Sequence, residues 1–151
     1  MLCMRTRWIS SILFHWHKKP EPSSFYLDAH WEDSLPLAEE VEIVLLRFKR
    51  FVIMIDDFAV PGDEGYTYDD YGLGKRLSLR DFPFHKDLRV RVFSPNRHSS
   101  QESGARRGCI VLASCALAPA LDSLDSLRHL ELSEVDDRGT LSDSAEEAAG
   151  V

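Results

Sequence analysis

Two apolar runs in the sequence end at acidic residues whose positions suit one shared site. The run 24–27 ends at Asp28, and the run 51–55 ends at Asp56 and Asp57, with Asp28 and Asp56 separated by 28 positions. That separation fits a strand-helix-strand crossover, which brings both strand ends to the edge of an open α/β sheet where ligands bind. Crowded carboxylates repel one another unless some are protonated or a cation lies between them. Oxygen ligands of this kind suit Mg²⁺ or another divalent cation.

Spacing alone leaves an alternative of equal weight for these carboxylates. Asp28 can cap the helix that follows it, and Asp57 can cap a turn. His30 and Trp31 lie in the same strand-end segment, directly after Ala29. His30 can act as a base or donor and Trp31 can stack on a planar ligand, but a solvated histidine and a ring covering the helix are the plainer alternatives.

A long loop rich in Gly, Asp and Tyr follows the second acidic pair, from residue 61 to residue 74. Long ordered loops in α/β proteins usually serve function, so this loop is a candidate lid or substrate wall. Arg106 and Arg107 further along can meet an anionic ligand or lie in a solvated hairpin loop. The residues of the loop and its end that we expect to face a substrate are Tyr66, Tyr68, Asp69, Asp70, Tyr71 and Lys75.

The elements that must position these residues are indicated by the hydrophobic pattern. Residues 24–27 are brief and aromatic, as in a buried strand. Ser34 offers an N-cap and Pro36 a first turn for an amphipathic helix whose apolar stripe runs from Leu37 to Phe48. The continuous β-rich run 51–55 is typical of a strand covered on both faces. Together they predict a right-handed parallel crossover and an α/β fold.

The rest of the chain predicts smaller elements around this crossover. Residues 76–82 suit a short helix, and 88–93 with 108–113 suit an antiparallel hairpin at the sheet edge. We expect a final helix over 116–132. We expect three parts in the chain. Residues 1–22 are predicted to form an amino-terminal helical segment that packs on the sheet, residues 23–132 to form the α/β domain, and residues 133–151 to form a disordered acidic tail. The apolar residues of the first segment recur at roughly helical spacing: Trp8, Ile9, Ile12, Leu13 and Trp16.

Composition excludes several classes of function. The 151-residue chain carries a formal net charge of −7, which disfavours nucleic-acid binding because phosphate neutralisation needs a basic face. From Glu131 onward seven acidic residues face one basic residue, Arg138, so the acidic excess lies in the tail. No apolar stretch is long enough to cross a bilayer, and three cysteines without metal-ligand spacing fit a reducing, cytoplasmic setting.

Two strings carry a resemblance to a known family. Over about 25–132 the chain resembles the carboxyl-terminal half of bacterial class I S-adenosylmethionine-dependent methyltransferase-like proteins. The two strings are FYLDAHWEDSLPLAEEVEIVLLRFKRFVIMIDDFAVPGDEGYTYDDYGLGK and ESGARRGCIVLA. The resemblance implies a partial Rossmann-like methyltransferase sheet. At the acidic residues the chain is similar to catechol-type O-methyltransferases, and this similarity implies a metal site at Asp28, Asp56 and Asp57. It also implies that Asp28, His30 and Trp31 contact the cofactor.

Departures from the family pattern limit what the resemblance implies. Ala29 is an extra residue before the His-Trp pair, and Glu32 stands where the catechol-type enzymes carry a basic residue, so the general base is open, with His30 as a candidate. The first 24 residues contain no glycine and hence no Gly-rich turn for S-adenosylmethionine. We therefore expect metal-assisted O-methylation of a hydroxylated small molecule or sugar as the ancestral activity, with this chain inactive alone. The alternatives are a non-catalytic module that self-associates through an open sheet edge, or a gene fragment.

Overall fold

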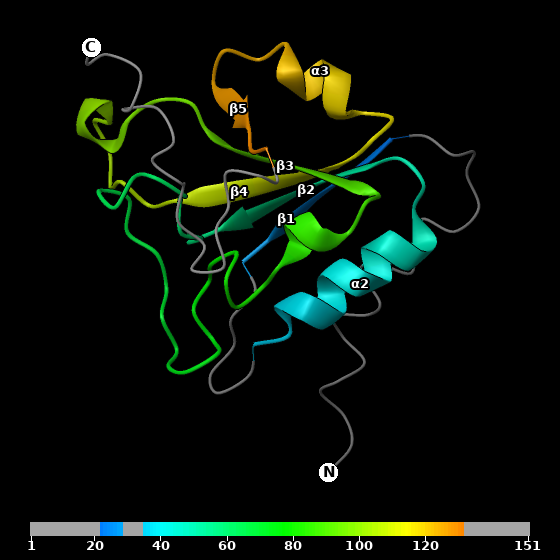
Figure 1. The fold of residues 1–151 in the computed structure, drawn as a ribbon, viewed down its shortest axis with the longest axis horizontal. Coiled ribbons are helices and arrows are strands. Elements are labelled where there is room, and N and C mark those ends of the chain that lie inside the picture. The colour runs from blue at the N-terminus through cyan, green and yellow to red at the C-terminus, as the bar shows by residue number, and fades with distance from the viewer. Residues whose placement is uncertain (1–21, 29–34, 132–151) are drawn as a thin grey trace, which may run out of the picture.

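The described part of the protein is built around one mixed β-sheet. A computed structural model describes residues 22–28 and 35–131. Within them, five strands form a sheet in the order β1-β2-β4-β3-β5, with helices on its two faces (Figure 1). The predicted α/β class is confirmed at this level. No helix in this part of the chain is long and apolar enough to cross a membrane.

The predicted crossover is present. Strand β1 (Ser23–Leu27) pairs in parallel with β2 (Phe51–Asp56), and α2 (Leu37–Arg47) connects them. Pro36 occupies the N-cap position without a side-chain cap bond, while the predicted cap, Ser34, lies outside the described residues. Acidic side chains in the first turn and a basic one in the last complement the helix dipole.

Helix α2 covers one face of the sheet and closes the main core. Its buried side chains Leu37, Val41 and Val44 pack on the alternate residues of the strands that point to the same face. Phe48, directly after the helix, contacts Phe25 of β1 edge to face, with ring centroids 4.9 Å apart. The strand residues of this core include Leu27, Phe51, Ile53, Ile55, Val90, Val92, Ile110 and Leu112.

The predicted hairpin is present, but it does not end the sheet. Strands β3 (Val90–Pro95) and β4 (Cys109–Ser114) pair antiparallel, and β4 lies between β2 and β3. Strand β5 (Leu127–His129) pairs with the outer side of β3 and takes the edge. The β2–β4 pairing is antiparallel too, with Asp56 opposite Cys109.

Two predicted helices were wrong. In place of a helix over 116–132, the chain forms α3 (Ala118–Asp122), a turn and β5. The short helix ends because Ser123 to Ser126 favour turn geometry, and β5 then satisfies the backbone groups of the outer side of β3. Residues 76–82 form turns, followed by the 3₁₀ helix η1 (Phe84–Lys86). A second one, η2 (Ser99–Gln101), lies in the β3–β4 connection.

The second face of the sheet is only partly covered by described residues. Helix α3 packs there on Phe93, Val111 and Ala113. Toward β1, however, the side chain of Met54 is 38% exposed and that of Tyr26 is 59% exposed. The prediction that β2 is covered on both faces therefore holds for one face only within the described residues. Most of the predicted helical segment 1–22 and the whole predicted tail 133–151 lie outside them.

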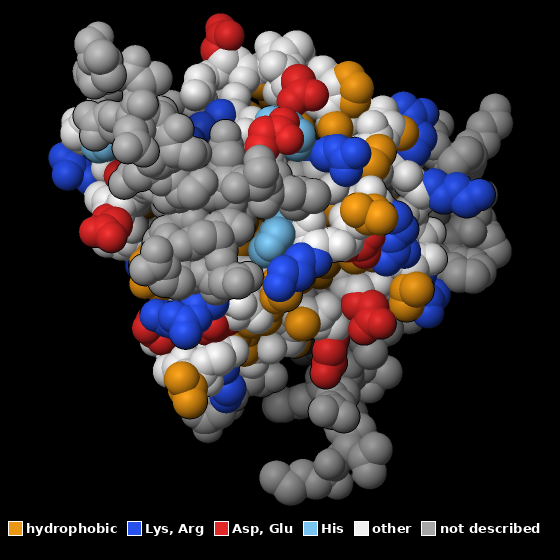
Figure 2. Space-filling view, viewed as in Figure 1, with side chains coloured by type: hydrophobic (Ala, Val, Ile, Leu, Met, Phe, Trp, Pro, Cys, Tyr) orange, Lys and Arg blue, Asp and Glu red, His pale blue; other side chains and the backbone are white. Residues whose placement is uncertain are grey.

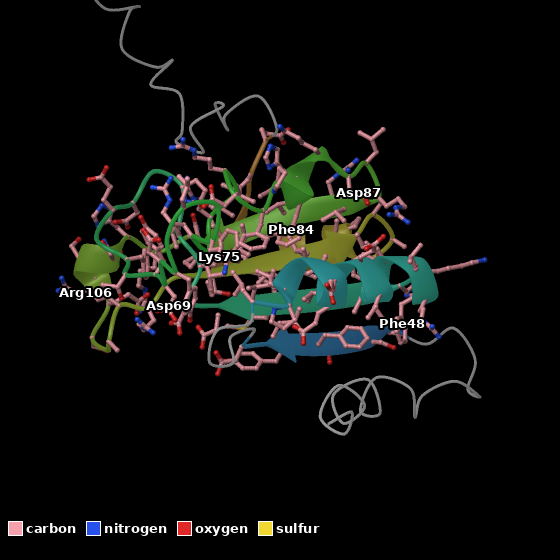
Figure 3. All side chains as sticks on the ribbon, turned by 90° about the horizontal axis from the view of Figure 1, so that it is seen from below. Phe48, Asp69, Lys75, Phe84, Asp87 and Arg106 are labelled. Atoms are coloured by element: carbon pink, nitrogen blue, oxygen red, sulfur yellow. The ribbon has the colours of Figure 1, made fainter. Side chains whose placement is uncertain are left out.

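Charged side chains are mixed on the described part of the face seen in Figure 2. Side chains of both signs are present on that part of the face, with several Lys and Arg side chains near one another toward the right of the view. Figure 3 places Asp69 and Arg106 toward one end of the sheet and Phe48 at the opposite end. The polar residues described next gather at the former end.

Candidate functional site

The predicted meeting of acidic residues at one edge of the sheet is observed. Leu27 pairs with Ile55, so Asp28, the exposed residue after β1, and Asp56, the last residue of β2, reach the same edge. Asp57 follows directly and is buried. We call Asp28, Asp56 and Asp57, together with Asp69 from the long loop described below, the carboxylate edge.

A hydrogen bond from Tyr26 connects β1 to the carboxylate edge. The Tyr26 hydroxyl donates this bond to the Asp56 carboxylate. That bond, together with partial burial and the nearby charges of Asp56 and Asp28, raises the pKa of Tyr26 to about 12. The phenol therefore stays protonated at neutral pH and acts as a donor. Asp56 also accepts a hydrogen bond from the backbone N–H of Asp57, with N and Oδ1 3.0 Å apart.

Asp57 is held by an arginine that lies 50 positions further along the chain. Its backbone has φ 52°, in the left-handed region that aspartate tolerates better than most residues. Its two carboxylate oxygens meet the Arg107 guanidinium at 2.5 Å from Nε and 2.8 Å from Nη2. This two-point geometry is the strong form of the Arg–carboxylate pair. Arg107 also reaches Asp69, with Nη2 and Oδ1 3.1 Å apart.

The direction of β4 brings Arg107 to this position. Because β4 runs antiparallel to β2, the residues that precede β4 lie where β2 ends. Phe58 donates its backbone N–H to the Gly108 carbonyl at 3.0 Å, and Gly108 donates to the Thr67 carbonyl at 2.8 Å. A Cβ at Gly108 would lie 2.2 Å from the Phe58 carbonyl oxygen, so only glycine permits this approach. Arg107 is thus fixed between β2 and the long loop.

The long loop contributes Asp69 and Tyr71 to the carboxylate edge. The Asp69 backbone N–H donates to the Asp57 carbonyl at 3.0 Å, which places the Asp69 side chain beside Arg107. Tyr71 donates its hydroxyl to Asp69 Oδ2 at 2.6 Å. Burial, this hydrogen bond and the charges of Asp69, Asp57 and Asp28 raise the pKa of Tyr71 above its usual value. Of the predicted loop tyrosines, Tyr71 is the one these contacts place at the edge.

The other predicted loop residues are divided between the turn that carries Tyr71 and the rest of the loop. Lys75 lies in the same turn, since its backbone carbonyl accepts the Tyr71 N–H at 3.4 Å. Tyr66 is buried, and its hydroxyl donates to the Arg97 carbonyl at 2.9 Å and to Glu102 at 3.1 Å. The carboxylate of Asp70 accepts the Gly72 backbone N–H at 2.8 Å and so closes a turn. Tyr68 and Lys75 have exposed side chains. The structure therefore brings Asp70, Tyr71 and Lys75 together in one turn and directs Tyr66 to the β3–β4 connection instead.

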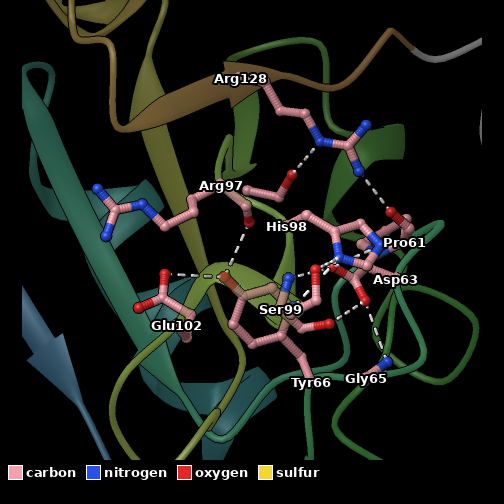
Figure 4. Close-up of polar contacts among 11 residues, drawn as sticks. Pro61, Asp63, Gly65, Tyr66, Arg97, His98, Ser99, Glu102 and Arg128 are labelled. Carbon is pink, nitrogen blue, oxygen red and sulfur yellow. Dashed lines mark hydrogen bonds and ion pairs between the residues drawn. The ribbon is translucent and has the colours of Figure 1, made fainter.

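A second polar cluster anchors the start of this loop to the β3–β4 connection (Figure 4). The Asp63 carboxylate accepts the Ser99 backbone N–H at 2.7 Å, the Ser99 hydroxyl at 2.6 Å and the Gly65 backbone N–H at 3.1 Å. Burial acts to raise the pKa of Asp63, yet the hydrogen bonds from Ser99 and Gly65 outweigh it and hold that pKa below its usual value. Arg128 joins the same region by donating to the Pro61 carbonyl at 2.5 Å.

The predicted metal ligands do not form a ready cation site in this arrangement. Both oxygens of Asp57 are engaged by Arg107, whose positive charge already occupies the place between Asp57 and Asp69. Within residues 22–28 and 35–131, no three His, Cys, Asp or Glu side chains are grouped so that they could hold a metal ion. The residues therefore fit an internal guanidinium better than a cation shared by Asp28, Asp56 and Asp57.

Some predicted site residues cannot be placed, and some site residues were missed. His30 and Trp31 lie outside the described residues. Sequence reasoning missed the role of Tyr26. It assigned Asp69 to the candidate substrate wall but not to a contact with Arg107, and it left Arg107 with two alternative roles, contact with an anionic ligand or a place in a solvated loop. The alternation of a strand offered a signal for Tyr26, since it is two residues before Asp28 and shares its face. No local signal links Arg107 to Asp57, because their contact depends on the direction of β4.

Comparisons with known proteins add no family. No protein-family model, no curated protein and no solved structure matches this chain. The geometry of the described residues is therefore the main support for any functional proposal.

The Asp63 anchor predicts a pH-dependent stability. Because the folded-state pKa of Asp63 is lowered, its ionised form stabilises the fold above the unfolded pKa, about 3.9, and that contribution is lost as pH falls through the folded value. We expect Asp63→Asn to lower the melting temperature at pH 7 and to differ less from the parent chain near pH 3. Thermal unfolding followed by circular dichroism at both pH values measures this. The exposed Asp122→Asn is the matched control, and an equal loss at both pH values would contradict the assignment.

The Arg107 contacts predict how the chain responds to Mg²⁺. Removing the guanidinium leaves Asp57 and Asp69 without their counter-charge, so we expect Arg107→Gln to bind Mg²⁺ several-fold more tightly than the parent chain. Calorimetric titration with MgCl₂ gives both affinities. The exposed Arg80→Gln provides the same charge change away from the site. Equal Mg²⁺ affinity in the two variants would show that Arg107 does not govern cation binding.

Proposed function

We propose that this chain is a partial class I S-adenosylmethionine-dependent methyltransferase-like protein, inactive alone, whose ancestral activity is O-methylation of a hydroxylated small molecule or sugar. The acceptor hydroxyl would bind at the carboxylate edge. The observation that carries the proposal is the convergence of Asp28, Asp56 and Asp57 at the carboxyl ends of two parallel strands, where open α/β sheets bind ligands.

The order of elements supports the same proposal. A strand, a crossover helix and a parallel strand are followed by a long loop and an antiparallel hairpin, the order that the sequence resemblance implies. The loop returns to the strand ends through Asp69 and Tyr71, so that groups from three segments surround one region. A site assembled in this way can select an acceptor by shape and by hydrogen bonding.

The chemistry required of the chain's own residues is hydroxyl binding and proton removal. A carboxylate of the edge would accept the hydrogen bond of the acceptor hydroxyl, and the protonated phenol of Tyr26 or Tyr71 would donate to a neighbouring oxygen. On transfer, the acceptor oxygen gains the methyl group, its proton passes to a base, and S-adenosylhomocysteine is released. The base is unassigned; His30 is the candidate from sequence and lies outside the described residues.

The proposal gives a role to the cofactor but none to a cation. S-adenosylmethionine would supply the electrophilic methyl carbon. Of the residues assigned to it by resemblance, Asp28 is described and exposed at the end of β1, whereas His30 and Trp31 are outside the described residues. No step is assigned to a divalent cation, since Arg107 already neutralises Asp57.

A binding experiment on the full chain tests the proposal. We expect calorimetry to detect binding of catechol, used as a dihydroxylated probe, and only weak binding of S-adenosylmethionine, because the first 24 residues contain no Gly-rich turn for that cofactor. Asp56→Asn should weaken catechol binding by about tenfold, the loss of one hydrogen bond to a charged group. Asp122→Asn, an exposed change on α3, should leave it unchanged. Absence of heat with both ligands would remove the methyltransferase proposal for this chain.

A non-catalytic interaction module is the second candidate. Strand β1 pairs with β2 on one side, and no strand among the described residues pairs with its other side. An open strand edge is a template for pairing with another chain. This candidate predicts a dimer or larger species in light scattering at micromolar concentration. Ser24→Pro should reduce it, because Ser23 donates its backbone N–H toward β2 and the N–H of the next residue, Ser24, therefore faces the open edge. A monomer over the whole concentration range would exclude it.

A further inference from the structure

One part of the sheet presents apolar side chains that the described residues leave uncovered. Ser24 pairs with Val52 and Tyr26 pairs with Met54, so these side chains lie together on the face opposite α2. We call the exposed Tyr26 and Met54 the open sheet face; Val52, beside them, is partly buried against the α3 cluster. Tyr26 is 59% and Met54 38% exposed, whereas Ile53 and Ile55, on the other face of the same strand, are fully buried.

The position of this face in the fold makes exposure to water unfavourable. Strand β2 is flanked by β1 and β4, and it is apolar on both faces, as expected for a strand covered on both sides. On the same side of the sheet, the cluster of α3 with Phe93, Val111 and Ala113 reaches Val52 of β2 but includes no residue of β1. A contiguous apolar area beside a covered one marks an interaction surface.

We infer that residues 8–16 of the same chain cover the open sheet face. This inference is independent of the proposed function. The segment carries Trp8, Ile9, Ile12, Leu13 and Trp16, which recur at the spacing of one helix face. It ends shortly before β1, so the occupant is already tethered to the strand that it would cover, and a tether raises its effective concentration at the face.

The lengths involved are compatible with this docking. A helix over 8–16 is about 12 Å long at ~1.5 Å per residue. Strand β1 spans five residues, or about 13 Å from end to end at ~3.3 Å per residue. The connection 17–22 contains Pro20 and Pro22, which stop a helix, and six residues reach up to about 20 Å. That reach allows the segment to reverse and run antiparallel to β1.

Charge supports the antiparallel direction. In that direction Arg5 and Arg7 would lie toward the end of β1 at which the carboxylate edge begins, and Lys18 and Lys19 toward the other end. The carboxylate edge has four acidic side chains, and the described cation that contacts it is Arg107. Two further arginines would therefore approach an acidic region.

Tryptophan fluorescence of the full chain tests the inference. The chain has three tryptophans, so Trp31→Phe leaves Trp8 and Trp16 as the reporters. In this background we expect short-wavelength emission and weak quenching by iodide. Met54→Lys should shift the emission to longer wavelength and increase quenching several-fold. Leu46→Lys, at a 70% exposed position on α2, is the matched control and should change neither.

A second variant and a second measurement keep the test decisive. Tyr26→Lys probes the same face from the edge strand, in case Met54→Lys fails to fold by circular dichroism. Solvent-exposed emission in the Trp31→Phe chain, or equal shifts in the Met54→Lys and Leu46→Lys chains, would overturn the inference. So would buried tryptophans that become exposed on dilution as light scattering shows a dimer dissociating, because the occupant would then be a second copy.

Discussion

Strand β2 pairs in parallel with β1 and antiparallel with β4, and most of the described structure depends on this pair of pairings. The parallel partner requires a crossover, which α2 supplies while it buries the main core against Ile53 and Ile55. The antiparallel partner begins where β2 ends. As a result, the ends of β1 and β2 and the beginning of β4 meet at one edge, and polar residues from all three segments are brought together there.

The electrostatics of that edge follow from this meeting. Acidic residues after two parallel strands would repel one another in the absence of a counter-charge. Arg107, next to the start of β4, supplies one by a two-point contact with Asp57 and a further contact with Asp69. Protonated Tyr26 and Tyr71 donate to two of the carboxylates. The edge thus holds its own positive charge in Arg107 and its own hydrogen-bond donors in the two phenols, so these carboxylates do not depend on a shared divalent cation for partners.

The two faces of the sheet differ in how far helices cover them. One face is closed by α2, and the other is closed by α3 only over β3 and β4. The apolar run FVIMI gives β2 apolar side chains on both faces. The uncovered part of the second face is therefore apolar as well, and among the described residues neither α2 nor α3 lies over it. The apolar stripe before β1 has the right length and tether to complete this layer.

The sequence by itself determined the crossover, the α2 stripe, the strands at 24–27, 51–55 and 108–113 to within a residue, and the meeting of Asp28 and Asp56 at one edge. These follow from local periodicity and from the fact that parallel strands end at the same edge. The sequence placed β3 at 88–93, whereas the strand spans Val90–Pro95 because residues 88 and 89 form a turn. Tertiary structure decided the partner of Arg107, because a contact across 50 positions depends on the direction and register of β4. It also decided that residues 127–129 form β5 instead of continuing a helix: the outer side of β3 offers unpaired backbone groups, and their pairing outweighs local helix preference.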